Sequence, residues 1–147
     1  MTVLVDADGC PVVNETIKLA KQYGKDCVLL CDTAHRFERP GARTITVPKG
    51  ADSVDFALVN MVRRGDVVVT QDYGLAAMCL ARGAVPIRQD GLVYTTDNID
   101  ALLQERHNAK KIRMAGGRMK GSAKRTGQED ENFFRGLEEL LKREPAV

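Results

Sequence analysis

The stretch Thr2-Val3-Leu4-Val5-Asp6-Ala7-Asp8-Gly9-Cys10-Pro11 decides the fold of this chain. Its first part is apolar and rich in β-branched residues, which predicts an interior strand of a parallel sheet over residues 2–6. Pro11 suits the first position of a following helix, where its missing N–H would have had no partner. The strand therefore delivers Asp6 and Asp8 to a helix entrance, which is where α/β proteins bind ligands. These two carboxylates are candidates either for helix caps or for metal ligands.

Apolar runs alternate with helical patterns along most of the remaining chain. Further strands are expected at 27–31, 44–48, 66–70, 84–88 and 92–94, and helices at 11–23, 53–64, 74–82, about 97–107 and 129–142. Such alternation is typical of a parallel sheet covered by helices. The predicted fold class is α/β, with a mainly parallel, doubly wound sheet followed by C-terminal helices.

The order of the strands follows from the connection rules. Right-handed crossovers and short connections make a doubly wound sheet the simplest closure, with the half that begins at Val67-Val68-Val69-Thr70 wound opposite to the first half. The first and fourth strands then flank a crevice. Asp6, at the end of the first strand, and Asp72, just past the fourth, are expected to face each other across it.

Composition indicates one domain. The chain has 147 residues, of which 44% are hydrophobic and 29% charged, so it falls in the range of a single compact domain over 1–147, with an acidic-site core at 1–95 and C-terminal helices with a basic loop at 96–147. No stretch approaches the roughly 18 apolar residues of a membrane span. The first apolar run is broken at Asp6, unlike a secretion signal. We therefore expect a cytoplasmic protein that does not associate with membranes.

The cysteines indicate reduced thiols. Four are present, Cys10, Cys27, Cys31 and Cys79, without a CxxC pair and in a chain large enough to need no disulfides. Two histidines and no CxxC argue against a structural zinc site. Cys10 precedes Pro11 at a predicted helix N-terminus, where the helix dipole lowers a thiol pKa. It is either a reactive thiol or a small buried residue beneath the site.

Five aspartates converge on the carboxyl edge of the predicted sheet. They are Asp6, Asp8, Asp52, Asp55 and Asp72. Clustered carboxylates repel one another and raise one another's pKa, so such a cluster is stable mainly when a proton or a divalent cation neutralises it. Mg²⁺ or Mn²⁺ is the natural occupant of an all-oxygen site. The alternative is that the aspartates next to helix starts are N-caps, each contributing about 1 kcal/mol.

The basic residues gather in the last third of the chain. Residues 1–100 carry 11 basic and 13 acidic side chains, whereas residues 101–147 carry 11 basic and 7 acidic ones. Eight of these cations fall in an acid-free segment with three glycines: Arg106, Lys110, Lys111, Arg113, Arg118, Lys120, Lys124 and Arg125. A flexible cationic loop of this kind attracts polyanions. The alternative is an ordinary solvated surface.

Clustered acids and a basic segment together favour hydrolysis of phosphoryl esters. One or two cations activate water and stabilise the charge that develops on the phosphate, and basic side chains hold a nucleic-acid backbone. Two other classes fit parts of the pattern. The motif Asp6-Ala7-Asp8-Gly9 after a strand is also how phosphatases of the haloacid-dehalogenase kind present an aspartyl nucleophile. A nucleic-acid-binding module without catalysis would need only the basic segment.

The motifs DADGCPV, KGADSVD and GDVVVTQDYGLAAMCLARGA, with the later segment NIDALLQERHNAKKIR, resemble the bacterial YaiI/YqxD family of largely uncharacterised proteins. The resemblance covers nearly the whole chain. That family is similar to PIN and NYN nuclease-like domains, which implies a PIN-like, three-layer α/β/α fold with an acidic metal-binding centre. What the resemblance implies is a fold and a candidate site.

The resemblance also assigns roles to individual acids. Asp6 looks like the first-strand aspartate of PIN-like sites, Asp52 like the acid at a helix start, and Asp72 like the aspartate after the fourth strand. Asp90 looks like a fourth acid. The leading hypothesis is a Mg²⁺- or Mn²⁺-dependent nuclease that acts on RNA or single-stranded nucleic acid. Asp6, Asp52 and Asp72 would ligate the metal, and Asp8 or Asp55 would orient water. The oligomeric state and the number of metal ions are left open.

Overall fold

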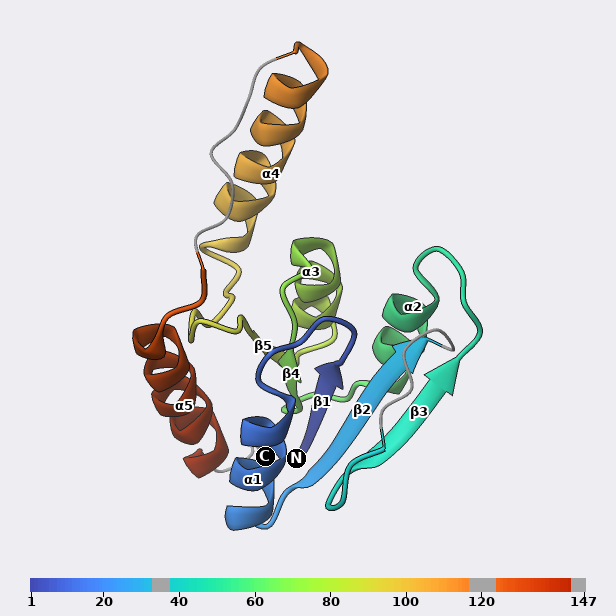
Figure 1. The fold of residues 1–147 in the computed structure, drawn as a ribbon, viewed down its shortest axis with the longest axis vertical. Coiled ribbons are helices and arrows are strands. Elements are labelled where there is room, and N and C mark those ends of the chain that lie inside the picture. Colours follow the sequence, from blue (N-terminus) through green and yellow to red (C-terminus); the bar gives the residue numbers. More distant parts are fainter. Residues whose placement is uncertain (33–37, 117–123, 144–147) are drawn as a thin grey trace.

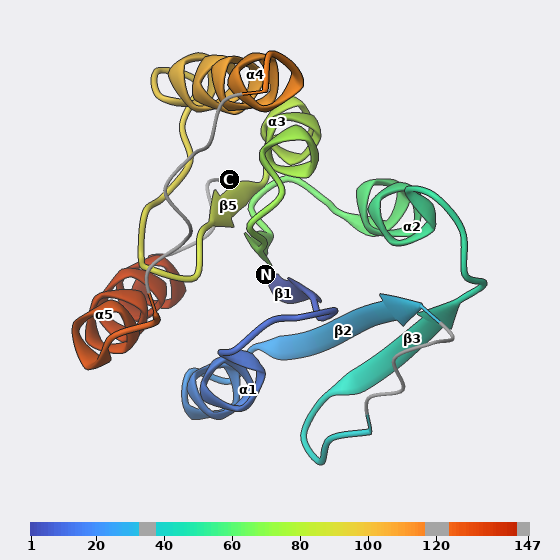
Figure 2. The ribbon, with the colours of Figure 1, turned by 45° about the horizontal axis from the view of Figure 1, so that its top comes forward.

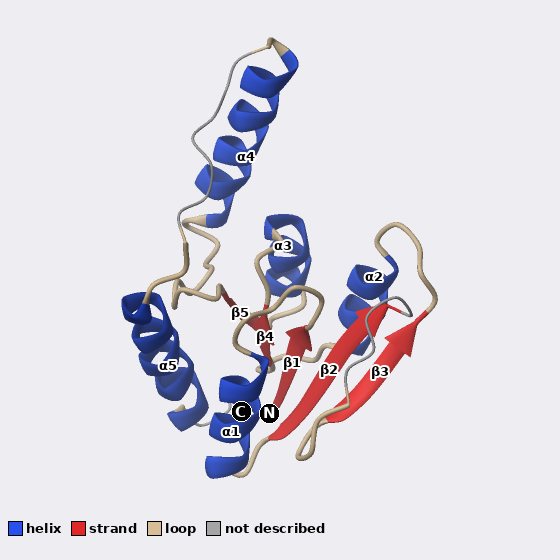
Figure 3. Ribbon diagram, in the orientation of Figure 1, coloured by secondary structure: helices blue, strands red, loops and turns tan. Residues whose placement is uncertain are grey.

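The protein, seen in a computed structural model, is described over residues 1–32, 38–116 and 124–143. The strands of its single sheet are β1 (Thr2–Asp6), β2 (Asp26–Asp32), β3 (Arg43–Val47), β4 (Val67–Val69) and β5 (Val85–Ile87). The helices are α1 (Val13–Gln22), α2 (Ser53–Met61), α3 (Tyr73–Ala81), α4 (Ile99–Met114) and α5 (Gly127–Lys142). Figure 1 follows the chain through these elements, and Figure 3 distinguishes strands from helices.

The sheet has the order β3-β2-β1-β4-β5, and every neighbouring pair is parallel. The winding reverses between β1 and β4, as the sequence predicts, because the chain moves outward from β1 through β3 and then returns to the other side of β1. Val5 pairs with Val69 in this register. Asp6 and the residues that follow Val69 therefore emerge at the same edge of the sheet.

Helices cover both faces of the sheet, which confirms the three-layer α/β/α arrangement (Figure 2). Val3 and Val5 belong to the core formed with α1 and α5, whereas Leu4 belongs to the core formed with α2 and α3. All three side chains are at most 1% exposed, as expected for a central parallel strand. The interior of β1 is thus apolar on both sides, and its carboxyl end carries the acidic residue Asp6.

Helix α4 lies outside these three layers. Its first turns pack on α3 through an apolar group that includes Ala76 and Ile99, and the rest extends away from the body of the molecule (Figure 1). The helix ends at Met114, close to Gly116, whose φ of 84° is not helical. The sequence pattern predicts an end near His107. The helix continues because residues 109–114 contain mostly strong helix formers.

Helix α5 closes the face that α1 covers. The predicted apolar stripe is confirmed, since Phe133, Leu137, Leu140 and Leu141 are at most 2% exposed. The backbone of α5 lies against the turn after β5, where a Cβ atom on Gly91 would lie only 2.5 Å from the carbonyl oxygen of Asn132. Only glycine permits this approach, because Gly91 also has a φ of 94°.

Two local predictions are wrong. Pro11 does not begin a helix, because Gly9, with a φ of 71°, lies in a turn in which the Cys10 N–H bonds to the Ala7 carbonyl, and α1 starts only at Val13. The expected strand at 92–94 is reduced to a single antiparallel bridge between Ile87 and Val93, since the tight turn at Gly91 leaves no length for a ladder. Among the described residues, no helix is long and apolar enough to cross a membrane.

Candidate acidic site at the edge between two central strands

Thr70 joins the ends of β1 and β4. Its hydroxyl donates a hydrogen bond to Oδ2 of Asp6 over 2.9 Å and accepts one from the backbone N–H of Asp72 over 3.0 Å. Thr70 is fully buried. Because β1 and β4 are neighbours in register, these three residues meet without any long side chain having to reach across.

Asp72 serves as the N-cap of α3. Its Oδ1 accepts the N–H of Leu75 over 3.1 Å, so the capping interpretation of this residue is correct. The same oxygen lies 3.8 Å from Nη1 of Arg106 on α4. Capping therefore does not remove Asp72 from the site, because the carboxylate still faces a cation that comes from a distant part of the chain.

Asp52 occupies the N-cap position of α2 but makes no capping hydrogen bond with its side chain. Its φ is +60°, and among the described residues it is the only one other than glycine with a positive φ. Such a conformation costs about 1 kcal/mol or more in a residue with a Cβ atom. The capping interpretation thus accounts for Asp72 and not for Asp52, which adopts a strained backbone without the stabilisation that a cap provides.

Two carboxyl groups of the site have strongly raised pKa values. Burial raises the pKa of Asp6 to about 6, and the negative charges of Asp72 and Asp8 add to the shift while the Thr70 hydrogen bond opposes it. Burial also raises the pKa of Asp55 to about 6, with further contributions from the charges of the surrounding aspartates. The predicted mutual repulsion of the carboxylates is therefore present.

A pocket of about 410 Å³ opens beside these acids. Asp52 and Asp55 from the start of α2 and Asp72 from the start of α3 line it, as the predicted convergence requires. Arg106 of α4 contributes a cation, and Phe56 and Met78 contribute apolar surface. Asp6 does not line this pocket, although its charge acts on Asp55.

Asp8 has a different setting. Its Oδ2 accepts the backbone N–H of Asp32, the last residue of β2, over 3.2 Å. Asp8 thus ties the turn after β1 to the neighbouring strand end. The predicted role in orienting water is separate from this contact and stays a prediction.

The side chains of the site can be tested for their fit to a bound metal ion. The donors are carboxylates accompanied by a hydroxyl, which is the chemistry that Mg²⁺ and Mn²⁺ prefer. The described residues nevertheless contain no group of three or more His, Cys, Asp or Glu side chains placed to hold one ion. The donor chemistry thus fits a divalent cation, while the described side-chain positions do not form a complete ligand cage.

Comparison with known proteins finds relatives that share nearly the whole length of the chain. Residues 4–143 match the model of an uncharacterised bacterial family, YaiI/YqxD. The chain belongs to the YaiI/YqxD family. A "UPF0178 protein" of Exiguobacterium sibiricum is 55% identical over 141 residues, which cover 96% of each chain. Another, of Ruminiclostridium cellulolyticum, is 50% identical over 144 residues, which cover 98% of this chain and 94% of the relative.

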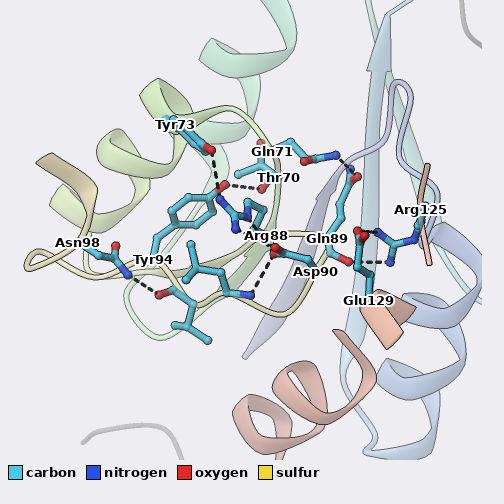
Figure 4. A network of polar contacts seen from close by, with 12 residues as sticks. Thr70, Gln71, Tyr73, Arg88, Gln89, Asp90, Tyr94, Asn98, Arg125 and Glu129 are labelled. Atoms are coloured by element: carbon cyan, nitrogen blue, oxygen red, sulfur yellow. Dashed lines mark hydrogen bonds and ion pairs between the residues drawn. The ribbon is translucent and has the colours of Figure 1, made fainter. Parts of the chain in front are cut away.

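In this member of the YaiI/YqxD family, Asp90 forms an ion pair with Arg88 and does not line the acidic pocket (Figure 4). Two guanidinium nitrogens of Arg88 donate to the two carboxylate oxygens over 2.8 and 2.7 Å, and they hold the pKa of Asp90 below its usual range. Arg88 also donates to the hydroxyl of Tyr73, and the hydroxyl of Tyr94 donates to the carbonyl of Thr70. Asp90 thus helps to hold the loop after β5 beside Thr70.

Arg125 is partly buried and is joined to the same loop after β5. It donates to the carbonyl of Gln89 over 2.6 Å and lies 3.8 Å from Glu129 (Figure 4). It also donates to Asp130 over 2.6 Å. Gln89 in turn accepts a hydrogen bond from Gln71. The charge of Arg125 is therefore compensated within the protein, unlike that of a free phosphate-binding arm.

The remaining predicted cations divide into three groups. Arg106, Lys110 and Lys111 are exposed side chains on α4, so they sit on a helix and not on the expected flexible loop. Arg113 lies on the same helix, and Lys124 is exposed just before α5. Arg118 and Lys120 lie outside the described residues. Since Lys110 follows Arg106 by four residues, both lie on the face of α4 that begins at the pocket.

Cys10 is not an activated thiol. Burial raises its pKa to about 11, and the nearby charge of Asp6 adds to the shift. The interpretation of Cys10 as a small, partly buried residue next to the site therefore holds. All four cysteines are free, as predicted.

A larger pocket, of about 900 Å³, lies at the opposite edge of the sheet. Lys21, Lys25 and Arg63 line it, at the ends of α1 and α2. The negative ends of the two helix dipoles point there, so cations are expected for structural reasons. Both oxygens of Asp66, which also lines the cavity, accept backbone N–H groups. We therefore place the candidate site at the carboxyl edge.

Two residues of the site were not predicted. Thr70 could have been recognised as a hydroxyl directly after a buried Val-Val-Val strand and two residues before Asp72. Phe56 could have been recognised because it lies off the apolar stripe of α2, two residues from both Val54 and Leu58. Both signals are local, but their meaning depends on which strands and helices are neighbours.

Proposed function

We propose that this protein is a divalent-metal-dependent hydrolase of phosphodiester bonds in RNA or single-stranded nucleic acid. The observation that carries the proposal is the raised pKa, about 6, of both Asp6 and Asp55. Carboxylates that are partly buried and crowded together at the winding reversal of a doubly wound sheet favour a site that binds a cation or a proton.

Each part of the proposed site has a definite task. A bound Mg²⁺ or Mn²⁺ would activate water and stabilise the charge that develops on the phosphate. Asp6, Asp52 and Asp72 would hold the ion, and Thr70 would keep the Asp6 carboxylate in place. Asp55 is suited to move a proton near neutral pH because its pKa is about 6. Arg106 now forms an ion pair with Asp72, and on substrate binding it would pair with a phosphate oxygen instead.

The basic residues of α4 extend this site. Arg106 lines the pocket, and Lys110 follows on the same helical face where α4 leaves the body of the molecule (Figure 1). Lys and Arg side chains along one face would contact successive phosphates and make binding fall with salt. A substrate strand would therefore run from the pocket along α4.

The test is cleavage of a labelled RNA oligonucleotide by purified protein with Mn²⁺ and with a chelator. We expect cleavage only with the metal, and a loss of roughly 100-fold or more in Asp6→Asn and Asp72→Asn. Asp26→Asn is the matched control, because Asp26 is exposed at the far end of β2. Cleavage that persists in both site variants would contradict the proposal, since it would come from another site or a contaminant.

A metal-binding measurement supports the interpretation of that test. Mn²⁺ should raise the melting temperature of the wild-type protein and of Asp26→Asn, and it should raise that of Asp6→Asn much less, because binding to the folded state alone stabilises it. If RNA binds equally well with chelator and the aspartate variants bind like the wild type, the protein is a binding module without catalysis. The exposed cations of α4 are the observation in favour of that second candidate.

A further inference from the structure

Large apolar side chains are exposed at two places in the described part of the chain. Phe56 is 59% exposed and Met78 37%, and both line the acidic pocket. The other two, Ile112 and Met114, lie at the end of α4. Single exposed apolar residues are ordinary, but here an aromatic ring and a thioether lie on the wall of one small pocket, and both stay exposed in the described protein.

The exposure of Phe56 follows from the geometry of α2. Val54 and Leu58 face the sheet, and Leu58 is fully buried. Phe56 lies two residues from each of them, which corresponds to about 200° around the helix axis. The ring must therefore point away from the sheet whenever α2 packs through its apolar stripe. Burying the ring would contribute about 1.5–3 kcal/mol, and the fold does not use this contribution.

We propose that the ring of Phe56 is a stacking platform for an unpaired nucleobase, and that it makes the site selective for single strands; this inference rests on the proposed function. The pocket combines the apolar Phe56 and Met78 with three carboxylates and the Arg106 guanidinium. A nucleotide has two matching parts, a flat base whose apolar faces suit Phe56 and Met78, and a phosphate that suits Arg106 and the cation that the carboxylates would hold. An apolar peptide would leave the charged half of the pocket without a partner.

The size of the pocket agrees with a single nucleotide. Its volume of about 410 Å³ lies in the lower part of the range found for sites that enclose small ligands. A base can reach the ring only if it is unstacked and unpaired, and proteins that bind single strands use aromatic rings in this way. Each such contact contributes about 1–3 kcal/mol and is tolerant of sequence.

The experiment separates binding from cleavage. Fluorescence anisotropy with a labelled single-stranded RNA, with and without Mn²⁺, is measured for the wild type, Phe56→Ala, Phe56→Tyr and Ile112→Ala. The last variant is the matched control, an exposed apolar residue away from the pocket. We expect Phe56→Ala to weaken binding roughly 5- to 150-fold and Phe56→Tyr to retain most of it. Phe56→Ala should fold normally, because the ring is exposed.

Two further comparisons make the result specific. The wild type should bind a duplex of the same sequence far more weakly than the single strand, and replacing one base of a short oligonucleotide by an abasic unit should remove most of the effect of Phe56→Ala. A wild type that binds single strands without cleaving them would leave the stacking inference standing while the proposed function fails.

Three outcomes would overturn the inference; the first two leave the proposed function to the cleavage assay, whereas the third counts against both. They are equal binding by Phe56→Ala and Ile112→Ala, equal affinity for duplex and single strand, and no binding of single strands by the wild type. A fourth is a dimer in light scattering that Phe56→Ala converts to a monomer, which would assign the apolar surface to a second copy of the chain.

Discussion

The hydroxyl of Thr70 lies 2.9 Å from Oδ2 of Asp6, and through this contact the end of β4 holds the side chain at the end of β1. The hydroxyl oxygen of Thr70 also accepts the N–H of Asp72. One buried hydroxyl therefore fixes two of the proposed metal ligands relative to each other. It also lowers the pKa of Asp6, against the larger effect of burial.

Replacing Thr70 by valine should separate these effects. Thr70→Val keeps the shape of the side chain but leaves the Asp72 N–H and the Asp6 carboxylate without their partner. We expect a loss of about 1–3 kcal/mol in the free energy of unfolding, measured with urea, and a further rise in the pKa of Asp6, measured by NMR titration. Thr70→Ser retains the hydroxyl and should behave nearly like the wild type. A valine variant of unchanged stability would show that the hydrogen bonds of the Thr70 hydroxyl do not stabilise the fold.

The raised pKa values predict how stability depends on pH in the presence of chelator. Between pH 3.8, the ordinary pKa of Asp, and about 6, the unfolded chain has lost the proton that folded Asp6 and Asp55 still hold. The free energy of unfolding should therefore fall as pH rises through this window and stay low above it. At pH 7, Asp6→Asn should be more stable than the wild type by about 1–2 kcal/mol.

This stability gain should vanish below pH 4, where the carboxyl group is neutral in both states. Asp55→Asn should likewise be more stable than the wild type at pH 7 and lose this gain below pH 4. Asp26→Asn serves as the control, because Asp26 is exposed at the far end of β2. Stabilisation of Asp6→Asn that is independent of pH would mean that packing, and not charge, is responsible.

Gly91 should resist substitution. A Cβ atom there would lie 2.5 Å from the carbonyl oxygen of Asn132, and the φ of 94° is unfavourable for any side chain. Gly91→Ala should lower the free energy of unfolding by about 2–4 kcal/mol because α5 must move. Gly127→Ala is the matched control, since a Cβ atom meets nothing within 4 Å there. Equal melting temperatures for the two variants would contradict the close packing of α5.

At Asp52, introducing glycine should relieve backbone strain. Asp52→Gly should be at least as stable as the wild type, because glycine adopts a φ of 60° freely, and Asp52→Ala should lose about 1 kcal/mol. If Asp52 serves function, both variants should lose metal-dependent cleavage. The stability difference between glycine and alanine should appear in thermal unfolding, and its absence would show that the conformation is not strained.

Much of the fold was predictable because its signals are local. Alternating apolar runs placed the strands of the sheet and most helices to within a few residues, and the connection rules set β1 next to β4. The extent of α4 and the reduced pairing at 92–94 were not predicted. The first depends on helix propensity in a segment that looked like a loop, and the second on the tight turn at Gly91.

The sequence by itself determined that buried strands end in aspartates, because the apolar pattern and the acids are contiguous in the chain. Only the tertiary structure decided what each acid does. Asp72 caps a helix and faces Arg106, Asp90 is held by Arg88, and Asp8 binds a backbone N–H. The physical reason is that the pKa and the partners of a carboxylate depend on burial and on neighbours, and these come from segments as distant in sequence as β1 and α4.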